Sequence, residues 1–235
     1  MNANKKLGRI IGVLLLIVVI SGAPGTLLRG LSRSLYETPD FLDQVSQNAV
    51  QMRFSVLLDM IASSLWVGIS IVLYPLIKQY RHSLALAFFG LWIANIAIII
   101  SGNMSHLSLL SLSEEYLGTA ASDQGVLNAI GMVKIEEYFW SHFMSLMLYS
   151  SASLFLFYFF FKTRLVPRFL SVWGMVAVSG VFLACWSNIF GQSVPMYVYM
   201  HNGLHIISLI IWLLVRGFNS SSLVSAPTRP MAHGG

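Results

Sequence analysis

The stretch LALAFFGLWIANIAIIIS, from Leu84 to Ser101, decides the fold of this chain because its 18 residues carry no charge. A hydrocarbon core about 30 Å thick is crossed by roughly 20 helical residues at 1.5 Å each. A run of this length and composition therefore predicts a membrane-spanning helix. Comparable apolar runs occupy residues 10–28, 54–77, 138–161, 169–186 and 196–215.

The composition of the whole chain agrees with this interpretation. Of its 235 residues, 56% are hydrophobic and only 10% are charged, whereas about 25% is usual in soluble domains. The runs lack the apolar/polar alternation of membrane-spanning strands. We therefore predict an all-α integral membrane bundle of six transmembrane helices. A single domain would cover residues 1–218, and residues 219–235, rich in Ser, Pro and Gly, would form a disordered cytoplasmic tail.

Basic and acidic residues are expected at opposite ends of these spans. All nine acidic residues lie at or close to one side of the predicted membrane, and most of the 14 lysines and arginines lie on the other. The exceptions are Arg29, Arg33, Arg53 and Lys134. By the positive-inside rule, both termini face the cytoplasm, and the chain is expected in the inner (plasma) membrane of a bacterium. Because the basic residues sit in short clusters at span ends, the net charge of +5 does not indicate nucleic-acid binding.

The first run also has features of a signal peptide, since lysines precede it and residues 21–23 resemble a cleavage region. Its extension through Pro24 to Leu28 gives a complete span. We therefore expect a retained helix with a break at residues 21–25. Cleavage, the alternative, would leave five spans.

Two connections on the acidic side are long, at residues 30–53 and 102–137. The spacing of Phe41, Leu42, Val45 and Val50 suggests a short interfacial helix in the first of them. The second is expected to be the longest loop, in which Asp123 caps a short helix leading to the fourth span.

Polar side chains inside the spans are the candidate functional groups, because ionisable groups in a bilayer are costly. His201 and His205 lie one helical turn apart and so share a face. Asp59 lies in the second span and His142 in the fourth. We expect an outward-facing cavity that binds a small molecule, lipid or ion. Its other polar side chains would be Ser63, Asn95, Asn103, His106 and Tyr149.

Three interpretations of these groups remain open. The first is hydrogen-bonded packing between helices, with no cofactor. The second is a metal site, with zinc bound by His142, His201, His205 and Asp59. The third is a haem- or quinone-binding redox subunit, in which His205 pairs with a histidine of another helix. The single cysteine, Cys185, excludes an internal disulfide.

Several short motifs resemble a bacterial membrane family known as domain of unknown function 4386. They are GRIIGVLLL at 8–16, LDMI at 58–61, LYPL at 73–76, VPR at 166–168, WG at 173–174 and WLLVRGFN at 212–219. The resemblance covers nearly the whole chain up to Asn219. It implies a multi-pass membrane protein without an assigned activity, so it assigns a role to no residue.

A looser resemblance is to the transmembrane hydrolases that include alkaline ceramidases. These enzymes hold zinc with three histidines, an aspartate and a serine, including a His-x3-His element in a late helix. His201 and His205 match that element, and Asp59, Ser63 and His142 supply the remaining residue types. The chain departs from those hydrolases in having six predicted spans rather than seven.

Overall fold

The computed structural model describes residues 3–29, 38, 41–120 and 124–219, and these residues contain helices and no strand. Six of the helices are long and apolar enough to cross a membrane, as the sequence predicts. The prediction of an all-α multi-pass membrane protein is therefore confirmed. The helices are α1 (Ala3–Leu28), α2 (Phe41–Gln47), α3 (Ala49–Tyr80), α4 (His82–Gly118), α5 (Gln124–Thr163), α6 (Arg168–Ile189) and α7 (Tyr197–Val215).

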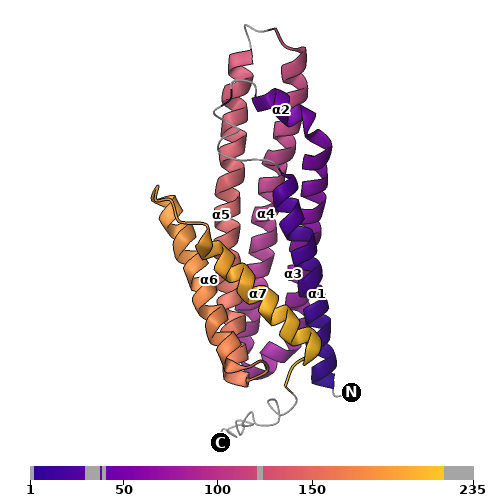
Figure 1. Ribbon diagram of the computed structural model, residues 1–235, viewed down its shortest axis with the longest axis vertical. Coiled ribbons are helices and arrows are strands. Elements are labelled where there is room, and N and C mark those ends of the chain that lie inside the picture. Colours follow the sequence, from indigo (N-terminus) through magenta and orange to yellow (C-terminus); the bar gives the residue numbers. More distant parts are fainter. Residues whose placement is uncertain (1–2, 30–37, 39–40, 121–123, 220–235) are drawn as a thin grey trace, which may run out of the picture.

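The long helices form a ring (Figure 1). Each packs mainly against two neighbours, in the order α1, α3, α4, α5, α6, α7 and back to α1. The first and last helices of the chain are thus neighbours. Helix α7 crosses obliquely, from the far end of α6 to the N-terminal part of α1.

Helices α4 and α5 have 37 and 40 residues, whereas α6 has 22 and α7 has 19. Both long helices extend well beyond their apolar runs at residues 84–101 and 138–161. The prediction of a loop at residues 102–137 is wrong, because most of that segment continues α4 and α5 beyond the apolar spans. The expected cap Asp123 lies outside the described residues. The physical reason is packing: Leu109, Leu110 and Ile135 are buried where the two extensions meet.

The short helix α2 confirms the helix expected in the first long connection. It buries Phe41, Leu42 and Val45 against the extensions of α4 and α5. Gly131 of α5 makes room for it, since a Cβ there would lie 2.7 Å from the Phe41 ring. The acidic end of the protein therefore has a small apolar core of its own.

Helix α1 is continuous from Ala3 to Leu28, with Pro24 inside it. The expected break at residues 21–25 is therefore absent. Packing against α3 supports this part of α1, because Gly25 brings its backbone close to the Leu58 side chain, 3.3 Å from an added Cβ. Helix α1 also contacts α7, so it packs against a neighbour on each side in the ring.

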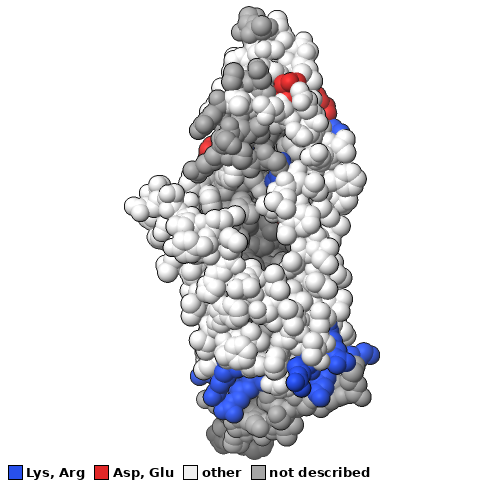
Figure 2. Space-filling model, in the orientation of Figure 1, with Lys and Arg blue, Asp and Glu red and all other residues white. Residues whose placement is uncertain are grey.

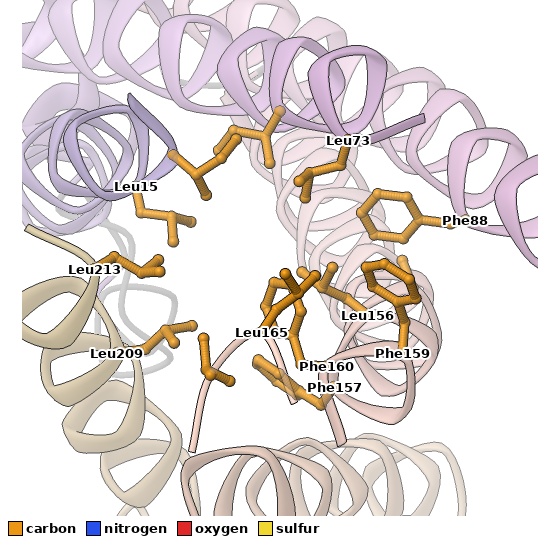
Figure 3. Packing of buried hydrophobic residues seen from close by; sticks show 14 of the residues in the cluster. Leu15, Leu73, Phe88, Leu156, Phe157, Phe159, Phe160, Leu165, Leu209 and Leu213 are labelled. Carbon is orange, nitrogen blue, oxygen red and sulfur yellow. The ribbon is translucent and has the colours of Figure 1, made fainter. Parts of the chain in front are cut away.

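Lysines and arginines gather at the end of the molecule where α1 begins and α7 ends, and acidic residues lie toward the opposite end (Figure 2). Near the basic end, apolar side chains from around the ring point to its centre (Figure 3). Leu15, Leu73, Phe88, Phe160 and Leu213 are among them, each no more than 3% exposed. This cluster fills the ring on the basic side.

The backbones of α1 and the C-terminal end of α7 touch at two glycines. Gly217 has φ +68° and follows the last turn of α7, where its N–H donates to Leu213 O at 2.9 Å. An added Cβ on Gly217 would lie 2.5 Å from Lys5 O, and one on Gly8 would meet the backbone N of Phe218. Only glycine permits so close an approach.

Candidate functional site

A cavity of about 210 Å³ lies among α1, α3, α4 and α5. Its lining begins at Val18 on α1 and at Tyr149 on α5, and it extends toward the acidic end as far as Arg29 and Tyr138. It therefore lies beyond the apolar cluster of the basic end. The lining residues that carry polar or aromatic side chains are Thr26, Arg29, Asp59, Ser63, Trp66, Trp92, Asn95, Tyr138, Ser141, His142, Ser145 and Tyr149.

One side of the cavity holds an ion pair between α1 and α3. Arg29 Nη2 lies 3.0 Å from Asp59 Oδ2, with the two side chains 6% and 29% exposed. Asn103 of α4 joins both residues, because its Nδ2 donates to Asp59 Oδ2 at 3.0 Å and its Oδ1 accepts from Arg29 Nη2 at 3.3 Å. The Arg29 guanidinium also lies 4.6 Å from the Tyr138 ring centre on α5. Four helices thus meet at one pair of opposite charges.

The other side of the cavity is aromatic. The rings of Trp66 and Trp92 stack with their centres 4.4 Å apart and their planes 7° from parallel. Tyr149 meets both edge-on, at 5.7 and 6.0 Å. Its hydroxyl accepts a hydrogen bond from Asn202 Nδ2 of α7 at 3.1 Å. The cavity therefore has a polar end and an aromatic floor.

Most of the remaining polar groups on the cavity wall bond to backbone. Ser63 Oγ donates to Asp59 O at 2.8 Å, and Ser145 Oγ donates to His142 O at 2.8 Å. Asn95 Nδ2 donates across to Ser145 O at 2.6 Å, which ties α4 to α5. The His142 ring stacks against Tyr138, with centres 6.2 Å apart.

The structure therefore brings together part of the predicted set. Asp59, Ser63, Asn95, His142 and Tyr149 line the cavity. Asn103 lies next to it, in the ion-pair network. His106 is fully buried, with its ring edge-on to Tyr138 at 5.7 Å.

His201 and His205 lie elsewhere, between α7 and α6. His201 Nε2 accepts a hydrogen bond from Trp173 Nε1 at 2.6 Å. His205 Nε2 lies 2.9 Å from Leu170 O, and its ring packs edge-on against Phe157 at 4.8 Å. Gly174 creates the space for this ring, since a Cβ there would lie 2.7 Å from His205 Cε1.

The metal hypothesis placed His142, His201, His205 and Asp59 around one ion, and the structure does not assemble them. Among the described residues, no group of three His, Cys, Asp or Glu side chains is placed to hold a metal. The physical reason is that three of the four groups already have another partner. Asp59 is held by Arg29, and the two histidines of α7 bond to α6.

The haem hypothesis depends on His205. An imidazole that ligates haem iron needs a ring nitrogen free to face the metal. His205 Nε2 lies against Leu170 O, whereas its Nδ1 is buried without a partner among the described residues. Its ring packs against Phe157 and Trp173 and over Gly174.

A family model described as domain of unknown function (DUF4386) matches residues 10–217. That match covers most of the chain and includes every residue that lines the cavity. The chain belongs to the DUF4386 family. No curated protein and no solved structure matches it.

Arg29 is the residue of this DUF4386 protein whose role sequence reasoning missed. It lies just beyond the C-terminal end of the apolar run of α1 and counted only as an exception to the charge pattern. Asp59 lies five residues inside the apolar run of α3, toward the same end of the bundle. Opposite charges near one end of a membrane bundle are expected to pair, and this was the available signal.

His106 of this DUF4386 protein lies beside the cavity, and its contribution to stability can be tested. Both of its ring nitrogens are buried without a hydrogen-bond partner among the described residues. Replacing an unpartnered polar group by an apolar one of similar shape removes its desolvation penalty. We expect His106→Phe to leave the thermal unfolding midpoint in detergent unchanged or higher. A midpoint that falls by several degrees would show that His106 has a partner.

Proposed function

We propose that the protein is a binding protein of the plasma membrane whose cavity takes a small, uncharged, ring-sized ligand from the side opposite the cytoplasm. The basic end would face the cytoplasm, because lysines and arginines favour that side. The cavity would then belong to the outer half of the bundle. The observation that carries the proposal is the pairing of a neutralised ion pair with an aromatic floor in one cavity.

The charge of the lining argues for an uncharged ligand. Arg29 and Asp59 cancel each other at 3.0 Å. An ionised ligand would lose its hydration in the cavity without gaining an unpaired opposite charge. A neutral ligand avoids that cost.

The hydrogen-bonding groups argue for a ligand with acceptors. Arg29 Nε and Trp92 Nε1 are buried donors with no partner among the described residues, and both residues belong to the lining. Such unpartnered groups are uncommon in native proteins. Neither atom is exposed to the cavity, so carbonyl or ether oxygens of a ligand would accept hydrogen bonds from them only after the Arg29 or Trp92 side chain moves.

The size and the aromatic floor argue for a ring. A dry apolar cavity of about 150 Å³ holds benzene, so about 210 Å³ accommodates one substituted ring. The flat faces of Trp66, Trp92 and Tyr149 favour aromatic or quinonoid partners. Catalysis is not part of the proposal, because Asp59 is held in an ion pair and the histidine pair of α7 lies outside the cavity.

The proposal is tested with two tail-less ring compounds, 2,3-dimethoxy-5-methyl-1,4-benzoquinone and 4-methylphenol. A compound that binds only the folded protein stabilises it by about 2.7 kcal/mol at 100 times its Kd. We expect at least one of them to raise the unfolding midpoint of detergent-solubilised protein. Gly22→Leu should abolish that rise, because Gly22 lines the cavity and an added Cβ meets only Ala62, at 3.7 Å.

Gly68→Leu is the matched control. An added Cβ at Gly68 meets no atom within 4 Å, and Gly68 does not line the cavity. This variant should respond to the compounds as the unmodified protein does. The proposal fails if neither compound stabilises the unmodified protein, or if Gly22→Leu responds as the control does.

A further inference from the structure

We infer that the ligand of this cavity is a tailed amphiphile that enters sideways from the bilayer, through a gap between the outer halves of α1 and α7. The inference rests on the proposed function and adds the class of ligand and its route. The ring-sized head would occupy the cavity. The apolar tail would lie in the gap, in contact with lipid.

The ring of helices is closed between α1 and α7 only near the basic end. There, Gly12 of α1 faces Leu213 and Leu214 of α7, with an added Cβ 3.0 Å from Leu213 Cβ. Arg9 Nη2 donates to Val215 O at 3.2 Å. These contacts involve the first turns of α1 and the last turns of α7.

Farther from the basic end the two helices separate (Figure 1). On α7, Gly203, Ile210 and Leu214 are spaced by seven and four residues, so they share one face. Leu214 of that face contacts α1, yet an added Cβ on Gly203 would meet no atom within 4 Å. On α1, a Cβ on Gly22 would meet only α3. The described residues therefore leave open space between the outer halves of the two helices.

The cavity faces this space. Its lining comes from α1, α3, α4 and α5, and neither α6 nor α7 contributes to it. Figure 2 shows a hollow about halfway along the molecule, at the place where α7 and α1 diverge in Figure 1. Among the described residues, the cavity thus has no wall from α6 or α7 on the side where these helices continue the ring.

The depth of the gap places it against lipid rather than water. Helix α6 has 22 residues and so spans about 33 Å, close to the thickness of the hydrocarbon core. The first turns of α7 follow the far end of α6, and Asn202 in these turns bonds to Tyr149 on the cavity floor. Asn202 lies five residues into α7, about 7.5 Å of helix at 1.5 Å per residue, so the floor lies just inside the outer boundary of the hydrocarbon core.

Size decides which part of the amphiphile enters. About 210 Å³ is too small for a lipid with two acyl chains but accommodates one substituted ring. The aromatic floor matches a flat ring, and the paired charges of Arg29 and Asp59 match an uncharged one. A prenylated or alkylated benzoquinone has this chemistry, with an uncharged head and an apolar tail.

The experiment compares the tail-less dimethoxy-methyl-benzoquinone with the same ring bearing a decyl tail, in micelles of one detergent. The readout is the concentration that gives half of the maximal thermal stabilisation. We expect the decyl compound to act at a concentration lower by about tenfold or more, because its tail gains apolar contacts. In the double variant Ala23→Trp/Gly203→Trp, this advantage should fall to threefold or less, because Ala23 is exposed and lies three turns beyond Gly12 on the face of α1 that meets α7.

Gly90→Trp is the matched control, since Gly90 is exposed on α4 and an added Cβ there also meets no atom within 4 Å. It should keep the full decyl advantage and so correct for partitioning into the micelle. An undiminished advantage in the double variant, with the tail-less head still bound, would overturn the lateral route and leave the proposed function standing. Failure of both compounds to stabilise the unmodified protein would overturn the proposed function as well.

Discussion

Replacing Arg29 by methionine is expected to lower the free energy of unfolding by about 2–3 kcal/mol. Removing one partner of a buried ion pair leaves an uncompensated charge and typically costs 3–5 kcal/mol. The expectation here is smaller because the Asp59 side chain is 29% exposed and retains some solvation. Asn103 loses one hydrogen-bond partner at the same time. The measurement is denaturant unfolding in mild detergent.

The double variant Arg29→Met/Asp59→Leu serves as the control for this prediction. It removes both charges, so most of the lost stability should return. If the double variant is as unstable as Arg29→Met, shape rather than charge explains the loss. An Arg29→Met protein as stable as the unmodified one would contradict the ion pair itself.

Replacing Gly8 by alanine is expected to have a comparable effect at the basic end, a loss of about 2–3 kcal/mol. Overpacking of a tight contact commonly costs 1–3 kcal/mol. The cost should be high here because the obstructing atoms are backbone: the added Cβ meets Phe218 N, and it lies 2.8 Å from Gly217 C. Backbone atoms cannot rotate away, so α1 and α7 must separate. Unfolding in the same detergent measures the change.

Gly68→Ala is the comparison for Gly8→Ala. Both glycines are helical, but a Cβ on Gly68 meets no atom within 4 Å. This substitution should stabilise the protein by up to about 1 kcal/mol, since alanine is the better helix former. Equal effects of the two substitutions would mean that the α1–α7 contact contributes nothing to stability.

Charge-free apolar length made the membrane helices predictable, and each predicted run lies within a long helix except for Met196, which directly precedes α7. The ends of α4 and α5 were not predictable in the same way. Beyond Ser101 the sequence contains many serines and glutamates and resembles a loop. Leu109, Leu110 and Ile135 nevertheless find partners in α2, and such tertiary partners are not visible from apolar length.

The candidate site was predictable in depth but not in position around the ring. Helical spacing placed Asp59, Asn95 and His142 toward one end of the bundle, and they do line one cavity. The same reasoning included His201 and His205, because depth alone does not reveal which helices are neighbours. The oblique path of α7 turns those histidines toward α6, where Gly174 leaves room for His205. Neighbour order is a property of the whole ring.

The contact between α1 and α7 also constrains how the protein is made. Arg9 and Val215 are 206 residues apart in sequence, so α7 leaves the ribosome long after α1. Contacts between distant parts of a chain form late in folding. During synthesis, Gly8 and Gly12 of α1 therefore enter the membrane before α7 is present to pack against them. A chain that stops before α7 would insert its first helices but leave α1 and α6 without the helix that joins them. We expect membrane quality control to degrade such fragments.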